Sequence, residues 1–198
     1  SGNPAAADGN GAMYTSAGQN FTVTVSAVAW QSADDVNNDG IPDNHDTAGA
    51  GSRADLSNNS VLTSFGKETP AESVTLSSGL LLPAGGNDPG LADGDSGADD
   101  GRVLTNFVNG VASTTKVYFD EVGIIEVEAK VTDGEYMGKT AGNTSDSNSY
   151  SPNIGRFIPA HFAFSSGDIS EACESGLDFS YLGQSFSGQF VVTPPSAQ

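Results

Sequence analysis

The chain has 198 residues, and its 25 Asp and Glu against 7 Lys and Arg give a formal net charge of −18. This charge excludes a protein that binds the phosphate backbone of nucleic acids regardless of sequence, because such proteins need clustered Lys and Arg. It also disfavours binding to anionic membrane surfaces. The apolar stretches are far shorter than the roughly 18 residues of a membrane span, so we expect no membrane insertion. An acidic surface suits an exported protein that binds cations.

Four segments alternate apolar and polar residues with the period of two that is typical of half-buried strands. In chain order they are 20–30, 72–82, 111–119 and 122–132. The residues expected to face the core are Phe21, Val23, Val25, Ala27 and Ala29 in the first, Val74, Leu76, Leu80 and Leu82 in the second, Val111, Val117 and Phe119 in the third, and Ile125, Val127, Ala129 and Val131 in the fourth. Strands of this kind form antiparallel sheets with one wet face. The predicted fold is therefore all-β, an Ig-like antiparallel β-sandwich with long acidic loops.

The sequence divides into four regions by composition. Residues 1–19 are rich in Ala, Gly and Asn and are expected to be loosely ordered, while 20–137 form the sandwich. Residues 138–155 are rich in Ser, Asn and Thr and are typical of a linker or long loop. The aromatic tail 156–198 is too short for its own core, so it either completes the first sandwich or starts a second, partial β unit. Phe162, Phe164, Tyr181 and Phe190 are expected to be buried in either case.

The strongest chemical motif lies in the acidic loop 33–59, within residues 35–46. Oxygen-bearing side chains stand at relative positions 1, 3, 5, 9 and 12, with a glycine at position 6. Alternate residues of such a loop converge on one hard cation, and the carbonyl at position 7 adds a main-chain oxygen. Because Ca²⁺ accepts six to eight oxygens in flexible geometry, it is the expected ion. The predicted ligands are Asp35, Asn37, Asp39, the carbonyl of Ile41, Asp43 and Asp46.

The motif has an alternative interpretation, and a second acidic loop gives a weaker signal. The loop could be a solvated Asn/Asp/Gly turn with no ion. A second acidic loop, 93–100, fits no strict spacing, so a surface loop without an ion is expected there. The first loop resembles the calcium repeats of thrombospondin type 3, with Asn37 in place of the second Asp.

Trp30 precedes the acidic loop and has two readings. It is either a core residue or an exposed platform on which a sugar stacks, and the second reading makes Trp30 a candidate ligand-binding residue. Cys173, the single cysteine, is either a buried small hydrophobe or half of a disulfide to a partner elsewhere.

Nothing in the sequence assembles an enzyme. The two histidines are His45, inside the acidic loop, and His161, which is expected to be packed or capping. Motifs for serine hydrolases, zinc proteases and nucleotide binding are missing from the sequence. Glu126 and Glu128 could serve a glycosidase, but their place on the expected wet face of a strand argues against this.

Three blocks of sequence resemble the conserved region of MshQ-like proteins, which are encoded with the MSHA type IV pilus system of Gram-negative bacteria. The blocks are Tyr118–Gly123 (YFDEVG), Gly155–Phe162 (GRFIPAHF) and Phe179–Phe186 (FSYLGQSF). The resemblance implies a piece of a large, exported, multidomain β-rich protein without enzymatic activity. It also implies that Gly123 supplies an unusual backbone angle at a tight corner before a strand.

These observations together predict a non-enzymatic, extracellular, calcium-binding β-sandwich segment of a pilus-associated adhesin or assembly protein. Its expected partners are other domains or subunits of a pilus or cell-surface assembly, reached by strand pairing. The alternative is a calcium-dependent carbohydrate-binding module that uses Trp30 and the acidic loops to hold glycans.

Overall fold

The computed structural model describes residues 11–97, 101–137, 149–170 and 187–193, with side chains described up to residue 163. The chain forms two compact units, Ser1–Ile158 and Pro159–Gln198. The described residues are almost entirely strands and loops, and their one helical turn is the 3-10 turn η1 (Leu56–Asn58). No helix in these residues is long and apolar enough to cross a membrane. The predicted all-β class is confirmed.

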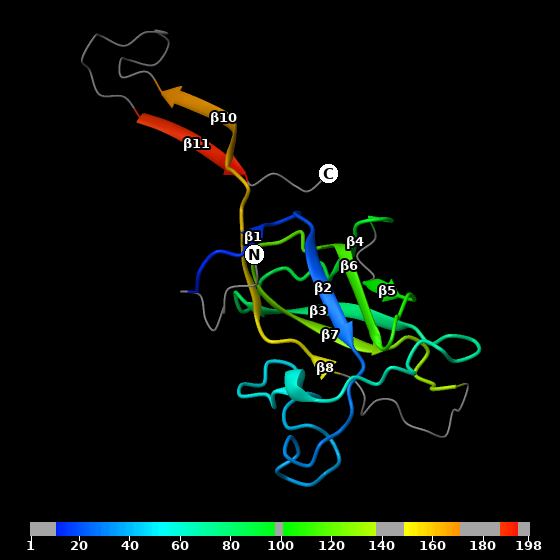
Figure 1. The fold of residues 1–198 in the computed structure, drawn as a ribbon. Coiled ribbons are helices and arrows are strands. Elements are labelled where there is room, and N and C mark those ends of the chain that lie inside the picture. Colours follow the sequence, from blue (N-terminus) through cyan, green and yellow to red (C-terminus); the bar gives the residue numbers. More distant parts are fainter. Residues whose placement is uncertain (1–10, 98–100, 138–148, 171–186, 194–198) are drawn as a thin grey trace. The chain divides into compact units, whose positions relative to one another are not determined.

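The larger sheet of the first unit has the strand order β1-β9-β7-β3-β5, with β8 also paired to β7 (Figure 1). Its strands are β1 (Thr15–Ser16), β3 (Val74–Leu82), β5 (Arg102–Leu104), β7 (Gly123–Val131), β8 (Ser149–Tyr150) and β9 (Ile154–Ile158). All neighbours are antiparallel except β1 and β9, which run parallel. The expected strands 72–82 and 122–132 pair with each other at its centre, from Val74↔Val131 to Leu82↔Ile124.

The smaller sheet has the order β2-β6-β4, with β2 (Phe21–Ser26), β6 (Val111–Tyr118) and β4 (Ala92–Asp93). Both pairings in it are antiparallel. On β2 the side chains alternate as expected: Phe21 is buried, whereas Thr22, Thr24 and Ser26 are exposed.

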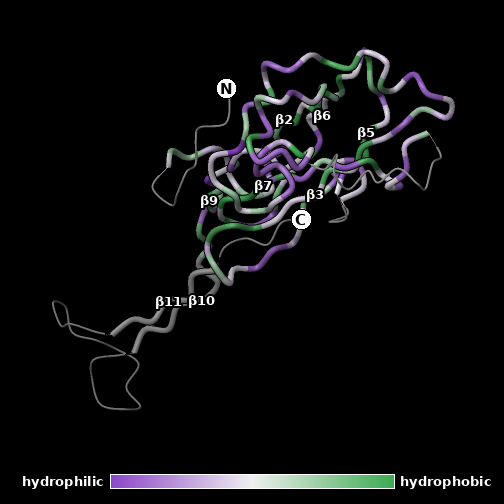
Figure 2. The backbone as a smooth tube through the Cα atoms, turned by 90° about the horizontal axis from the view of Figure 1, so that it is seen from below, coloured by the Kyte–Doolittle hydropathy of each residue, from purple (hydrophilic) through white to green (hydrophobic). Residues whose placement is uncertain are grey.

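One apolar cluster joins the two sheets. Phe21 and Val117 of the smaller sheet lie in it together with Leu76, Ile125 and Phe157 of the larger sheet. The alternation of hydrophilic and hydrophobic residues along these strands is visible in Figure 2. Because apolar faces from both sheets meet in one core, the first unit is sandwich-like.

The structure corrects the predicted face of β6. Val111 was expected inside, but Ala112 and Thr114 are buried there and Val111 is only half-buried. The reason is a bulge: Phe21 pairs with Val117 but Val23 pairs with Thr114, so β6 takes an extra residue. An extra residue moves the following side chains to the other face of a sheet. A similar shift after Leu80 leaves Leu82 38% exposed.

Gly123, at the start of β7, has the unusual backbone angle that the resemblance implied. Its φ is +144°, and a Cβ at this position would stand 2.2 Å from the carbonyl oxygen of Leu82. A side chain is therefore excluded both by the backbone angle and by the close approach of β3.

The second unit contains a two-stranded antiparallel sheet of β10 (Ala163–Ser170) and β11 (Ser187–Thr193). The boundary between the units lies between Ile158 and Pro159, so Arg156–Ile158 belong to β9 of the first unit. Within the expected linker 138–155, residues 149–150 form β8 and residues 154–155 begin β9.

The aromatic residues of the tail are only partly covered by the structure. The predicted burial of Phe162 is wrong, since this side chain is 65% exposed. It lies between β9 and β10, outside the alternation of either strand. Phe164, Tyr181, Phe190 and Cys173 lie outside the described side chains.

Candidate cation-binding loop

Asp35 forms the base of the predicted calcium loop. It is 2% exposed, and its two carboxylate oxygens accept hydrogen bonds from the main-chain N–H groups of Asp39, at 3.1 Å, and Gly40, at 2.9 Å. These residues hold positions 1, 5 and 6 of the motif. Gly40 has a φ of +93°, so the glycine supplies the tight bend that was expected at position 6.

The next two oxygen ligands of the motif make the same kind of turn. The Asn37 side-chain oxygen accepts from the N–H of Asp39, at 3.1 Å, and the Asp39 carboxylate accepts from the N–H of Ile41, at 2.9 Å. The Asn37 amide also donates to Asp39 at 2.8 Å. Successive side-chain oxygens therefore bind main-chain amides two residues further on, which fixes the curvature of the loop.

The last two predicted ligands are placed differently. Asp43 accepts a hydrogen bond from the N–H of Val36, at 3.3 Å, which ties the second half of the loop back to the first. Asp46 is exposed and accepts from the hydroxyl of Thr47 at 3.0 Å. The described residues contain no group of three or more His, Cys, Asp or Glu side chains that stands close enough to hold a metal ion.

The loop is anchored to the larger sheet by an ion pair that the sequence analysis missed. Arg53 Nη1 lies 2.7 Å from the carboxylate of Glu126 on β7, and the N–H of Gly49 donates to the same carboxylate at 2.7 Å. Glu126 is 1% exposed, so the prediction that it faces water is wrong. The acidic loop covers this part of the sheet. The sequence does contain a signal for this ion pair, because Arg53 is the one base among six acids in 33–59.

His45 fastens the same loop at a second point. Its Nδ1 lies 2.8 Å from the hydroxyl of Ser149 on β8, and its Nε2 lies 2.8 Å from the carbonyl of Ala54. The N–H of Tyr150 also donates to the carbonyl of His45, at 3.2 Å. Burial, followed by the nearby carboxylates of Glu128 and Glu126, raises the pKa of Tyr150 above its ordinary value. The His45 ring is thus a structural bridge between loop and sheet.

Asn59 fixes the beginning of the loop. Its side-chain amide donates to the carboxylate of Asp34, at 2.8 Å, and to the carbonyl of Ala29, at 2.9 Å. Asp34 and Asn59 are 8% and 6% exposed, so this contact is buried. The segment before the loop and the segment after it are thereby joined at the end of the sandwich.

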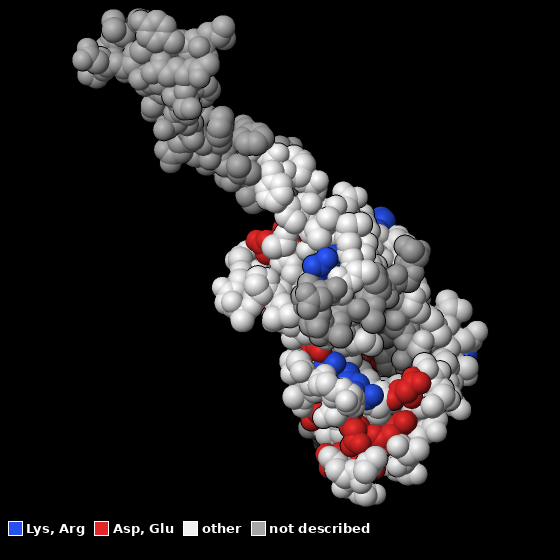
Figure 3. Space-filling model, turned by 90° about the vertical axis from the view of Figure 1, so that its left-hand side faces the viewer, with Lys and Arg blue, Asp and Glu red and all other residues white. Residues whose placement is uncertain are grey.

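Trp30, which follows Ala29 directly, is 55% exposed. The interpretation of Trp30 as a core residue is therefore wrong. The alternative, an exposed side chain on which a sugar could stack, stays a prediction. His161, expected to be packed or capping, is exposed as well. Acidic side chains gather at the lower end of the face shown in Figure 3, the end at which Figure 1 draws the acidic loop.

In the described part of the second acidic loop, residues 93–97, two carboxylates pair with bases of the chain. Arg102 pairs with Asp93 and, at 2.7 Å, with Asp95, which also pairs with Lys116. The hydrogen bonds from Lys116 and Arg102 hold the pKa of Asp95 below its ordinary value.

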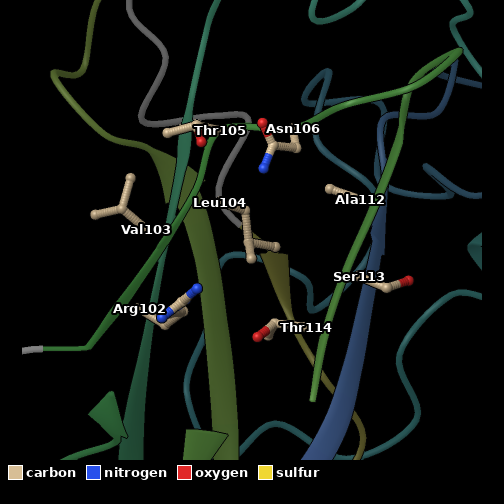
Figure 4. A pocket seen from close by; sticks show the side chains of 8 residues that line it. All are labelled: Arg102, Val103, Leu104, Thr105, Asn106, Ala112, Ser113 and Thr114. Atoms are coloured by element: carbon tan, nitrogen blue, oxygen red, sulfur yellow. The ribbon is translucent and has the colours of Figure 1, made fainter. Parts of the chain in front are cut away.

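A small cavity of about 80 Å³ lies between β5 and β6 (Figure 4). It is lined by Arg102, Val103, Leu104, Thr105, Asn106, Ala112, Ser113 and Thr114. Pockets that enclose small-molecule ligands usually measure about 300–1,000 Å³, so this cavity is too small for a sugar ring or a cofactor.

Comparison with known proteins identifies the family. The model of the second domain of DUF6701 matches residues 1–116, and that of the third domain matches residues 121–198. The chain belongs to the DUF6701 family. No curated protein and no solved structure matches it. The first model ends within β6, at residue 116, and the second begins just before β7, at residue 121. Leu76, which the first model matches, and Ile125, which the second matches, lie in the same core. Residues matched by both DUF6701 models therefore contribute to one sandwich in this chain.

Proposed function

We propose that this DUF6701 segment is a non-enzymatic, exported β-sandwich module whose acidic loop binds calcium. The observation that carries the proposal is the preformed turn on Asp35, in which a buried carboxylate is held by the amides at positions 5 and 6 of the motif. The proposed ligands are Asp35, Asn37, Asp39, the Ile41 carbonyl, Asp43 and Asp46.

The donor set suits a hard cation. Carboxylates, one amide oxygen and one main-chain carbonyl are the ligands that Ca²⁺ takes in proteins, and their number allows the six to eight oxygens it accepts. Each Asp35 oxygen accepts one loop amide and keeps a further lone pair for an ion. Binding would bring the carboxylates of Asp35, Asp39 and Asp43 closer together than they stand in the structure, and this rearrangement is part of the proposal.

The mechanism would be structural. A bound ion would neutralise the repulsion among the carboxylates and order the tip of the loop, residues 35–43. The base of the loop is already fixed by Arg53, His45 and Asn59. The entropy that binding must overcome is thus confined to these nine residues at most, each costing about 1–2 kcal/mol of backbone entropy where it is not already ordered.

Calorimetric titration of the EDTA-treated chain tests this proposal. Calcium should bind with a stoichiometry of one, and magnesium should bind more weakly because it demands a stricter octahedron. A chain that takes up neither ion, and whose melting curve EDTA leaves unchanged, would contradict the calcium site.

The exposure of Trp30 favours a second candidate, a calcium-dependent carbohydrate-binding module. An exposed indole presents an apolar face with a polar edge, which suits contact with a partly apolar ligand such as a sugar ring. Since Trp30 is the single tryptophan of the chain, its fluorescence reports directly on binding there. A glycan array followed by a fluorescence titration with any glycan that binds separates the two candidates. Trp30→Ala lacks the fluorophore, so its loss of glycan binding is measured on the array itself.

The assignment to a pilus-associated, MshQ-like protein rests on the three blocks that carry the resemblance. Two of them lie on structural corners: Tyr118–Gly123 joins β6 to β7, and Gly155–Phe162 runs from β9 to the start of the second unit. The proposed partners are other domains or subunits of the pilus or cell-surface assembly. Antibodies against the chain should label intact cells and sheared pili, whereas label confined to lysed cells would contradict export.

A further inference from the structure

We infer that β2 is a self-association edge, at which two copies of this chain pair antiparallel and join their smaller sheets into one. β2 stands at the end of the order β2-β6-β4, and in the described part of the chain no strand pairs with its other side. An edge of this kind presents main-chain N–H and C=O groups that a further strand can bind.

The direction of the main-chain groups shows which residues form the free edge. The N–H of Ala27 donates to the carbonyl of Gly110, at 2.8 Å, on the side of β6. Since these directions alternate along a strand, the main-chain N–H and C=O groups of Phe21, Val23 and Val25 also point toward β6. The N–H and C=O groups of the residues between them therefore point away from β6, namely Thr22, Thr24 and Ser26.

This edge has none of the features that usually prevent pairing. Edge strands are commonly protected by Lys, Pro, bulges or very short length. β2 has six residues, Phe-Thr-Val-Thr-Val-Ser, without a charge or a proline. The extra residue of the bulge described above lies on β6 rather than on β2. β2 is thus an unprotected strand of high β-propensity.

The distribution of charge favours a second copy as the occupant. In a chain of net charge −18, no charged residue occurs from Gly9 to Ala33. Two copies approaching through most other surfaces would bring carboxylates together, but through β2 they bring together only Thr, Val and Ser. The outer face beside it is also uncharged at Ser113, whose hydroxyl lies 2.8 Å from that of Thr24.

The strand is also symmetric in the type of its residues about Thr24. An antiparallel pair centred there places Thr24 opposite Thr24 of the second copy and Thr22 opposite Ser26. These residues carry the outward main-chain groups, so each opposed pair exchanges two main-chain hydrogen bonds. Val23 then lies opposite Val25 on the core side, and the pattern of buried and exposed residues continues across the junction.

Sedimentation equilibrium of the intact chain tests the association. The expected mass is twice the 20.1 kDa of one chain, with dissociation on dilution. Thr24→Lys should shift the mass to that of one chain, because it places two like charges opposite each other. Thr115→Lys is the matched control: Thr115 is exposed on β6, one strand in from the free edge, so this variant should stay dimeric. A wild type that is monomeric up to its solubility limit, or a dimer that survives Thr24→Lys, overturns the inference.

Disulfide trapping tests the register in a Cys173→Ser background. In a hydrogen-bonded antiparallel pair the opposed Cα atoms lie about 5.5 Å apart, which a disulfide spans. Thr24→Cys should therefore cross-link on oxidation. Thr22→Cys should not, since the two copies of residue 22 would stand about 13 Å apart along the strands. Equal cross-linking of both variants would overturn the symmetric pairing. Disulfide trapping remains informative even if Thr24→Lys fails to fold.

Discussion

Arg53 of the acidic loop and Glu126 of β7 form a buried ion pair, with Nη1 and the carboxylate 2.7 Å apart and side chains 9% and 2% exposed. The pair joins the loop that carries the predicted cation ligands to the central strand of the larger sheet. The stability of the loop is thereby coupled to that of the sandwich, and the coupling can be measured.

Removing one partner of this pair should be strongly destabilising. Arg53→Met leaves the Glu126 carboxylate buried with only the Gly49 amide, and we expect a loss of about 3–5 kcal/mol in unfolding free energy. The double variant Arg53→Met/Glu126→Leu should lose less than the sum of the single variants, because it leaves no buried charge. Urea unfolding measures all three.

An exposed pair supplies the control for that experiment. Lys130 and Glu128 lie 4.0 Å apart, and the Lys130 side chain is 44% exposed. Lys130→Met should therefore change the unfolding free energy by less than about 1 kcal/mol. If Arg53→Met cost no more than Lys130→Met, the anchor would have no structural importance.

Asp39→Ala should abolish the stabilisation of the chain by calcium. Asp39 supplies an oxygen at position 5 of the loop. Its N–H donates to the Asn37 side-chain oxygen, and its carboxylate accepts from the Asn37 amide. An ion that binds only the folded state stabilises it by about 2.7 kcal/mol at a hundred times its dissociation constant. Thermal melts with calcium and with EDTA should differ for the wild type and coincide for the variant. Asp88→Ala, in a loop outside the motif, should retain the calcium shift.

Truncation should distinguish residues that belong to the first unit from those that follow it. A chain ending at Ile158 retains β9 and should fold with the stability of the first unit. A chain ending at Gly155 loses Phe157, which is 2% exposed and lies 5.5–5.7 Å, between ring centroids, from Tyr14, Phe21 and Phe119. Loss of a buried Phe costs about 3–5 kcal/mol. Equal denaturation midpoints for the two chains would show that β9 contributes little.

A truncation between the two DUF6701 models should be more severe. A chain of residues 1–116 retains β3 and β5 but lacks β7 and β9, which pair with each other at the centre of the larger sheet. We expect it to remain unfolded by circular dichroism, because Leu76 and Phe21 lose their packing partners. Cooperative unfolding of this fragment would contradict the shared core.

Gly123→Ala should destabilise the sandwich although it adds only one methyl group. The added Cβ would stand 2.2 Å from the Leu82 carbonyl oxygen, so β3 or β7 must move. Gly40→Ala is the informative comparison: its φ is also positive, at +93°, but no atom lies within 4 Å of the added Cβ. Chemical denaturation should therefore show a larger loss at Gly123 than at Gly40.

Local pattern was enough to predict four longer strands of the first unit and the tight bend of the acidic loop. The period-two alternation identified β2, β3, β6 and β7, because a strand between a core and water must alternate. The glycine at position 6 makes the predicted bend. The oxygen side chains at positions 1, 3 and 5 bind nearby main-chain amides, and these contacts span only a few residues.

The tertiary structure alone decided the features that depend on contacts between distant residues. Glu126 has the pattern of a wet-face residue, and it is buried because Gly49 and Arg53, more than 70 positions earlier, cover it. The bulge on β6 depends on its pairing with β2, and the exposure of Trp30 depends on where the acidic loop packs. Alternation along one strand shows which side chains share a face. It carries no information about which loop covers that face, because that is settled by packing between segments far apart in the chain.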